Sequence, residues 1–196
     1  MKAISFILSG KTACFRKPDV NQFAYFTYNN IHKPALLGLF GAVIGLAGYT
    51  QLNDENIRNK KDKKPLNNGF PEFYDKLQHL KISIIPLVPN GYFSKKIQTF
   101  NNGVGYASQE EGGNLIVREQ WLENPIWQIM ILDDGSSEYR QIKDYLENGK
   151  AVFVPYLGKN DHFADIKEVK SIELESHILE DRIHSLFIEK NLKQIG

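Results

Sequence analysis

The sequence predicts a single α+β domain in which strands and helices follow one another in the order βαββαβ. Three observations carry this prediction: short segments whose apolar residues alternate, segments with helical features, and clusters of Gly, Pro and Asn that separate them. The 196 residues, of which 42% are hydrophobic and 24% charged, suffice for one well-cored domain with an elaboration.

The first strand and the first helix are expected within residues 3–47. Apolar residues alternate over residues 3–8, which indicates a strand, and Ser9-Gly10-Lys11 predicts a turn after it. A helix is expected over residues 34–47 because Pro34 suits the first helical position and an apolar run follows it. Glycine costs about 1 kcal/mol relative to alanine inside a helix. Four glycines therefore indicate that a sheet, a helix or a phosphate chain closely approaches this backbone: Gly38, Gly41, Gly45 and Gly48.

The next part of the chain is expected to contain a loop, a helix, a strand and an insertion. Residues 51–69 are polar and rich in lysine, and we expect a long basic loop there, solvated in the plainest interpretation. Residues 71–79 predict a short helix, and residues 80–88 predict an apolar strand. Residues 90–125 combine loosely alternating flanks with Asn-Asn-Gly and Gly-Gly, so they predict a long hairpin with a glycine-rich tip.

The last helix and strands complete the pattern. Residues 126–132 indicate a buried strand, and a helix is expected over residues 136–146 with Ser137 as its N-cap. Residues 151–154 are expected to form the next strand, and residues 168–175 could form another, whereas the tail fits a helix or a strand equally. Without the insertion, βαββαβ is the order of the ferredoxin-like fold, which RNA-recognition modules share, although a fold alone does not define a function.

Composition bounds the compartment and the partners. The single cysteine, Cys14, excludes an internal disulfide and fits a reducing cytoplasm. The longest apolar run, Pro34 to Tyr49, is shorter than the roughly 20 residues of a membrane span, and no signal-peptide pattern begins the chain, so we expect a cytoplasmic protein with no membrane partner. Residues 1–69 hold ten Lys and Arg but four Asp and Glu, so they carry +6 and the remainder −5. Such a one-sided field can steer an anionic partner.

The common catalytic and metal-binding signatures do not occur in the sequence. The five histidines form no His-Glu-x-x-His motif, and no cysteine pair, Gly-x-Ser-x-Gly motif or Walker-type phosphate loop is found. We therefore expect no metal site, no cofactor and no catalytic residue.

The approach to the first helix predicts an anion-binding site. Because His32 and Lys33 are poor side-chain caps, the first amides of the helix are expected to be open to a phosphate, which the helix dipole would also attract. Lys33 would add charge, and Tyr28 could stack on a base. The alternative is that Asn30 caps the helix and the aromatic residues before it belong to the core.

Three segments resemble a known family: residues 9–18, residues 30–45 with Lys-Pro-Ala-Leu-Leu-Gly-Leu-Phe-Gly-Ala-Val-Ile-Gly, and residues 155–165 with Pro-Tyr-Leu-Gly-Lys-Asn-Asp-His-Phe-Ala-Asp. Together they are similar to CRISPR-associated protein family five, and most similar to its type I-B branch. The resemblance implies a subunit of Cascade, the RNA-guided surveillance complex of antiviral defence. It further implies an RNA-recognition-like domain with a thumb hairpin at residues 90–125 that grips the 5′ handle of the guide RNA and caps the backbone filament.

The resemblance also implies partners and site residues. The partners are the guide RNA, the backbone and large subunits, and target DNA reached through the complex. The handle would be contacted by lysines and arginines near the start of the chain, by the stem of the thumb and by the loop after residue 155. Without the resemblance, the basic residues would be interpreted as ordinary surface charges and the loop as a turn. The implied RNA-binding residues are Lys11, Arg16, Lys17, Tyr28, Asn30, His32, Lys33, Lys95, Lys96, Gly158, Lys159, Asn160 and His162.

Two other functions stay open at this point. One branch of the family cleaves the guide precursor with a tyrosine and a Lys-His pair, and this chain has the reversed pair His32-Lys33 after Tyr28. The alternative function is therefore a metal-independent endoribonuclease that processes repeat RNA, although type I-B systems normally use a separate processing subunit. The other possibility is a protein-interaction module that does not contact RNA.

Overall fold

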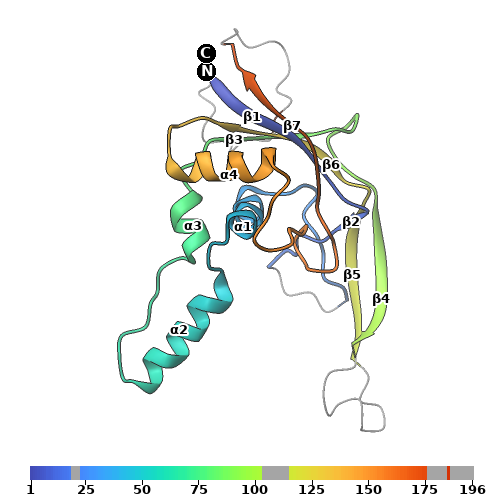
Figure 1. Ribbon diagram of the computed structural model, residues 1–196. Coiled ribbons are helices and arrows are strands. Elements are labelled where there is room, and N and C mark those ends of the chain that lie inside the picture. Colours follow the sequence, from blue (N-terminus) through green and yellow to red (C-terminus); the bar gives the residue numbers. More distant parts are fainter. Residues whose placement is uncertain (19–22, 103–114, 176–184, 186–196) are drawn as a thin grey trace, which may run out of the picture.

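The computed structural model describes residues 1–18, 23–102, 115–175 and 185 (Figure 1). These residues form two antiparallel sheets and four helices, which confirms the predicted α+β class. Among them, no single helix is long and apolar enough to cross a membrane.

The larger sheet has the ferredoxin-like order. Its strands are β1 (Lys2–Ser9), β3 (Ile82–Pro86), β6 (Ile126–Leu132) and β7 (Asp165–Glu173), arranged β3-β6-β1-β7 with every neighbouring pair antiparallel. Two strands joined through helices, such as β1 and β3, are therefore parallel and separated by one strand. This is the split βαβ arrangement that the order of elements predicted.

Helices α1 (Lys33–Ile44) and α4 (Ser137–Glu147) pack on one face of this sheet (Figure 1). The hydrophobic core lies between these helices and the sheet. Within it, Phe6 of β1 meets Phe40 of α1 edge to face, with ring centroids 6.1 Å apart. Trp127 of β6 is also fully buried. Helix α4 is capped by Ser136, whose hydroxyl accepts from the Tyr139 N–H at 3.1 Å, one residue before the expected cap Ser137.

The glycines of α1 allow another helix to approach. A Cβ on Gly41 would lie 2.6 Å from the Cβ of Phe73, which belongs to α3 (Glu72–Leu77). Gly45 ends α1 in the left-handed conformation with φ of 82°, which favours glycine at this position. The close approach predicted from the sequence is therefore helix on helix.

The expected basic loop at residues 51–69 is wrong for most of its length. Residues Tyr49–Lys61 form helix α2, and the N–H of Gly48 donates to the side chain of Gln51 at 3.0 Å at its start. The helix has no buried residue. Sequence periodicity missed it because a helix with no buried residue needs no apolar stripe.

The expected strand at residues 151–154 is also wrong. The N–H groups of Val152 and Phe153 donate to the carbonyls of Val43 and Ala42 at 2.9 and 3.0 Å, so this segment closes the C-terminal end of α1. The fourth strand of the sheet is β7, which covers most of the strand left possible at residues 168–175. Of the tail, the structure describes Ser185, whose hydroxyl accepts from the Ile84 N–H of the edge strand β3 at 3.2 Å.

The smaller sheet contains the insertion. Strands β4 (Lys95–Asn102) and β5 (Leu115–Glu123) pair antiparallel, and β2 (Thr12–Ala13) pairs with the other side of β5. The glycine-rich tip between β4 and β5 lies outside the described residues. The assignment of residues 90–125 as a thumb stays a prediction.

Candidate nucleic-acid interface

Two stretches that precede α1 pair with each other. The N–H of Lys17 donates to the Phe26 carbonyl and that of Tyr28 to the Phe15 carbonyl, both at 2.8 Å. The hydroxyl of the fully buried Thr27 accepts from the Phe15 N–H at 2.9 Å. These bonds fix the backbone, so the outward side chains of this segment have defined positions.

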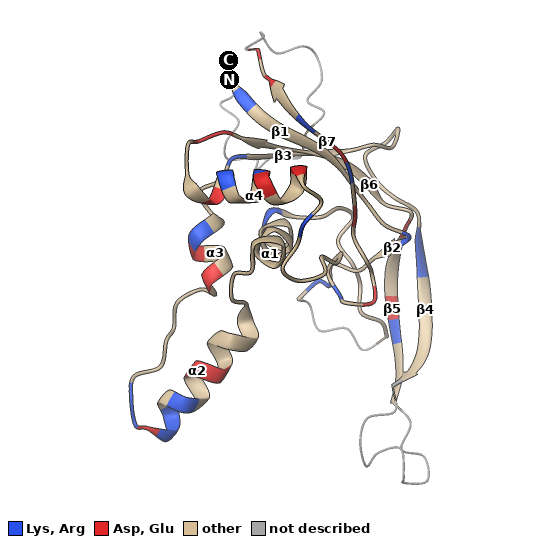
Figure 2. Ribbon diagram, in the orientation of Figure 1, with Lys and Arg blue, Asp and Glu red and all other residues tan. Residues whose placement is uncertain are grey.

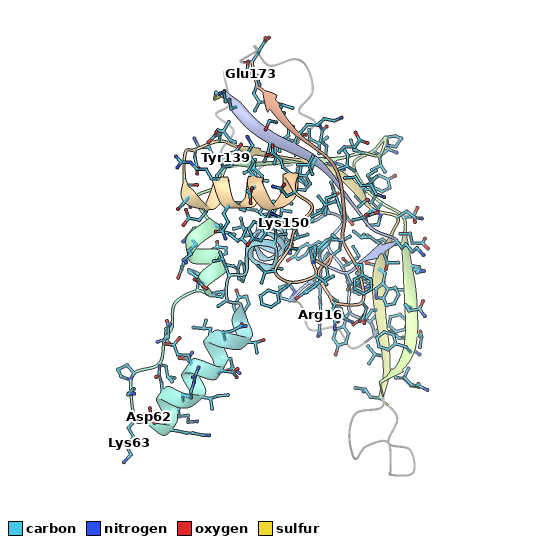
Figure 3. The ribbon with its side chains drawn as sticks, in the orientation of Figure 1. Arg16, Asp62, Lys63, Tyr139, Lys150 and Glu173 are labelled. Atoms are coloured by element: carbon cyan, nitrogen blue, oxygen red, sulfur yellow. The ribbon has the colours of Figure 1, made fainter. Side chains whose placement is uncertain are left out.

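The same segment is attached to β5. The Tyr25 N–H donates to the Arg118 carbonyl, and the Gln120 N–H donates to the Tyr25 carbonyl, both at 2.8 Å. The guanidinium of Arg16 lies 3.4 Å from the centre of the Tyr25 ring, and that of Arg118 lies 5.0 Å from the centre of the Phe23 ring. Figure 3 places Arg16 between α1 and the β4–β5 hairpin. Each cation thus lies on an aromatic ring.

Two lysines complete this arrangement. The ammonium of Lys17 lies 5.7 Å from the centre of the Tyr28 ring, and Lys95 at the start of β4 donates to the side-chain oxygen of Asn29. Burial, and then the nearby charge of Lys17, lower the pKa of Lys95. Figure 2 shows cationic segments on β4 and on the chain beside it. We call the whole set the cationic aromatic surface: Arg16, Lys17, Phe23, Tyr25, Tyr28, Lys95 and Arg118.

The charge of this surface is one-sided. In the part of the chain that the structure describes, none of its four cations forms an ion pair with a carboxylate. Phe23 and Tyr28 are 64% and 38% exposed, so both retain ring surface that a base could cover. Exposed rings beside cations of this kind are what a single-stranded nucleic acid contacts, because bases stack on the rings and phosphates meet the cations.

The expectation of free amides at the start of α1 is wrong. His32 is the N-cap, and its Nδ1 accepts from the Ala35 N–H at 3.2 Å, while its carbonyl accepts from the Leu36 N–H at 3.1 Å. The ring of His32 stands edge to face with that of Tyr28, 5.2 Å between centroids. Burial lowers the pKa of His32, so the ring is neutral at pH 7.

Two further residues of this approach have internal partners. Asn30 donates to the Gly91 carbonyl at 2.9 Å and accepts from the Trp127 indole at 3.0 Å, so it joins the hairpin base to the core and is not the cap of α1. The ammonium of Lys33 donates to the Gln78 carbonyl at 2.7 Å, and burial lowers its pKa. These side chains hold the fold around the cationic aromatic surface.

The loop after residue 155 lies against the opposite face of the hairpin. Lys159 donates to both carboxylate oxygens of Glu119 at 2.8 Å, and Glu119 is 5% exposed. Burial raises the pKa of Glu119, but the hydrogen bonds from Lys159 and Trp121 outweigh it, and the net pKa is lowered. The charge of Lys159 is therefore compensated inside the protein.

Two neighbours of Lys159 are also held by internal contacts. His162 is 2% exposed, its Nδ1 lies 2.7 Å from the Thr12 hydroxyl, and its ring meets that of Trp121 edge to face at 4.7 Å. Gly158 has φ of 91°, and a Cβ there would lie 2.0 Å from the Cys14 carbonyl oxygen, so the position requires glycine. Asn160 is exposed.

Lys11 and Lys96 lie at a different place from the cationic aromatic surface. They line an open cleft of about 940 Å³ that also contains the carboxylates of Glu123, Asp161 and Asp165. Lys96 lies 3.8 Å from Glu123 and 5.9 Å from the centre of the Trp121 ring. The mixed charge of this cleft makes it a poor phosphate site.

The structure therefore divides the thirteen residues named from the sequence. Arg16, Lys17, Tyr28 and Lys95 meet at one surface. The rest have hydrogen-bond partners around the start of α1, line the cleft or lie on the loop near Lys159. Sequence reasoning missed Phe23, Tyr25 and Arg118 as site residues. The run of aromatics at residues 23–28 was a signal for the first two, whereas the position of Arg118 depends on a long-range pairing that has no local signature.

No metal centre is evident in the described part of the chain, where no group of three or more His, Cys, Asp and Glu side chains could hold an ion. The single thiol, Cys14, is buried, and burial raises its pKa to about 11. A thiol with this pKa is protonated at pH 7 and is a weak nucleophile.

Comparison with solved structures identifies the fold. A chain described as a CRISPR RNA-guided surveillance complex is similar to this one with a TM-score of 0.55 and 15% identity, over 83% of this chain and 60% of that chain. A Cas protein matches with a TM-score of 0.45 and 11% identity, over 81% of this chain and 57% of its own length. A CRISPR-associated protein matches with a TM-score of 0.40 and 12% identity, over 87% and 69%.

The first of these similarities establishes that the two chains share a fold, and this chain spans 60% of the length of that relative. No protein-family model matches the sequence, and no curated protein matches it either.

Proposed function

We propose that this chain is a non-catalytic subunit of a type I-B CRISPR Cascade surveillance complex that binds and caps the 5′ handle of the guide RNA. The observation that carries the proposal is the cationic aromatic surface at the base of the hairpin. The fold shared with a chain of an RNA-guided surveillance complex supports a role in such a complex, and the sequence resemblance supports the type I-B branch. In this proposal the hairpin contacts the backbone subunit, and the large subunit and target DNA are reached through the assembled complex in the cytoplasm.

The chemistry of the surface suits a single strand. Stacking of a base on an aromatic side chain contributes about 1–3 kcal/mol, and it does not depend strongly on which base is present. Phosphates would meet Arg16, Lys17, Lys95 and Arg118, whose positions are already fixed by contacts with rings or with Asn29. A site whose side chains are ordered beforehand loses less conformational entropy when the RNA binds.

The test is a fluorescence-anisotropy titration of the full chain with labelled handle RNA at several salt concentrations. For a single strand, the slope of log affinity against log salt is shallower by about 0.7 for each phosphate that the protein no longer neutralises. The double variant Lys17→Gln/Lys95→Gln is expected to reduce the slope by about 1.4, since two cations are neutralised. The matched control is Lys143→Gln/Lys150→Gln on and after α4, which should behave like the wild type. Equal slopes for both variants would overturn the proposal and favour a protein-interaction module.

A specific observation keeps an endoribonuclease as the second candidate, because the rings of Tyr28 and His32 are adjacent and Lys17 lies beside them. The hydrogen bonding of His32 argues against it. Because Nδ1 accepts from the Ala35 N–H, the proton of the neutral ring lies on Nε2, and that nitrogen then has no lone pair to act as a general base.

Purified protein incubated with repeat RNA in EDTA decides between the two candidates. We expect no cleavage. Cleavage that persists in EDTA and disappears in His32→Ala would establish the nuclease instead.

A further inference from the structure

Helix α2 and the chain that returns from it form an arm, residues 49–70, that leaves the body of the protein (Figure 1). The helix has 13 residues and none of them is buried. A helix of this length is marginal in water without tertiary packing, so the arm depends on other interactions for its stability.

The far end of the arm carries a dense group of cations. We call it the basic tip: Arg58, Lys60, Lys61, Lys63 and Lys64, all exposed. The one acid within it, Asp62, lies 3.1 Å from Lys64. Figure 2 shows these cations gathered at the end of α2 that is farthest from the sheet. Cations in the last turn stabilise a helix through its dipole, and this stabilisation is weaker for Lys63 and Lys64, which lie beyond the helix.

The conformation of the tip is fixed by hydrogen bonds. The side chain of Asn56 donates to the Asn67 carbonyl at 2.9 Å and accepts from the Asn67 N–H at 2.7 Å, which ties the returning chain to the helix. The N–H of Lys64 donates to the Asn59 carbonyl at 2.8 Å, and Lys63 takes the left-handed conformation with φ of 56°. The five cations are therefore presented from the end of a helix and the ordered turn after it, and not from a plain solvated loop.

We propose that the basic tip binds the phosphate backbone of double-stranded nucleic acid. Cations that approach phosphates supply affinity without reading sequence, and a duplex presents about one negative charge per 1.7 Å of its axis. Single-strand sites add aromatic rings on which bases stack. No aromatic residue lies between Tyr49 and Phe70, so the tip offers charge without a stacking platform, in contrast to the cationic aromatic surface.

The basic tip is a site separate from the cationic aromatic surface. The arm and the hairpin leave the body on different sides of the molecule (Figure 1). The inference does not depend on handle binding, because the two sites share no residue and each can be altered alone.

The experiment measures binding of the full chain to a short duplex DNA and to single-stranded DNA of the same length, at several salt concentrations. The test variant neutralises the four lysines of the tip as Lys60→Gln, Lys61→Gln, Lys63→Gln and Lys64→Gln. We expect duplex affinity to fall about tenfold or more, and the salt slope to fall by about 0.9 for each phosphate that the tip no longer neutralises. Binding of the handle RNA should not change, which separates this outcome from failure of the proposed function.

The control neutralises four exposed lysines on or directly beside the strands of the larger sheet: Lys2, Lys81, Lys167 and Lys170. It removes the same total charge and should leave duplex affinity close to that of the wild type. Circular dichroism confirms that both variants remain folded. Duplex binding and a salt slope that survive in the tip variant would overturn the inference, as would equal reductions of affinity in the tip variant and the control. An equal reduction for single-stranded DNA would overturn the assignment to a duplex.

Discussion

Replacement of Lys159 by methionine tests whether this lysine serves the fold or the RNA. In the native protein its ammonium neutralises the carboxylate of Glu119, which is 5% exposed, through two hydrogen bonds of 2.8 Å. Lys159→Met keeps most of the side-chain length but leaves a buried, uncompensated carboxylate. Removal of one partner of a buried pair costs about 3–5 kcal/mol. Because the Lys159 side chain is 31% exposed and Trp121 still donates to Glu119, we expect about 2–3 kcal/mol.

The destabilisation should depend on pH in a defined direction. In the wild type the pKa of Glu119 is lowered, so its contribution to stability is present above the unfolded pKa and is lost as the pH falls through the folded pKa. In the variant, burial without Lys159 should raise this pKa, and protonation then relieves the unpaired charge. The stability difference between the two proteins should therefore be largest at pH 7. It should begin to shrink as the pH falls through the raised pKa of the variant and should level off below the lowered pKa of the wild type.

Urea unfolding at a series of pH values measures this difference, with Lys143→Met as the control. Lys143 lies 3.8 Å from Glu147 on the exposed side of α4, and removal of such a surface pair should change stability little. A variant at Lys159 that is as stable as the wild type, or whose deficit does not change with pH, would refute the reasoning. If the Lys159 variant remains folded and binds the handle as weakly as Lys17→Gln/Lys95→Gln, Lys159 is a residue of the RNA-binding site.

Two further predictions concern helices, and thermal or urea unfolding tests both. Gly41→Ala should destabilise by about 1–3 kcal/mol because its Cβ would lie 2.6 Å from Phe73, whereas Gly38→Ala, with nothing nearer than 3.7 Å, should stabilise by up to about 1 kcal/mol; the reverse order would contradict the packing of α3 on α1. Ser136→Ala should cost about 1 kcal/mol through removal of the α4 cap, while Ser137→Ala should cost much less, and equal costs would show that the cap is misassigned.

The strands of the main sheet were predictable because burial of one face produces a local pattern of alternating apolar residues in the sequence. In β1, Ile4, Phe6 and Leu8 face the helices, and the period of two that results is visible without any knowledge of the partner strand. Helix α2 has no such pattern, since none of its residues is buried. The apolar pattern of residues 151–154 was misleading. These residues close the end of α1, but a short apolar run of this kind resembles a strand when the sequence is considered alone.

The site was harder to predict because it is assembled by contacts between distant parts of the chain. Arg118 joins Phe23 only because the segment around Tyr25 pairs with β5. Lys159 and Lys33 could not be separated from Lys17 by residue type, since all three are lysines in basic or loop segments. Their roles differ through partners that lie 40 and 45 residues away in the sequence.

The availability of a cation, and not its presence, therefore decides which lysine can bind a phosphate. A phosphate that approaches Lys159 must compete with the Glu119 carboxylate, and one that approaches Lys33 must displace the Gln78 carbonyl. Near Lys95 the neighbouring charge is Lys17, a like charge that lowers the pKa of Lys95 together with burial. An arriving anion relieves that repulsion, and it competes with the neutral side-chain oxygen of Asn29 but with no carboxylate of the described chain. The electrostatics of the surface thus favour an anionic ligand at Lys17 and Lys95 over one at Lys33 or Lys159.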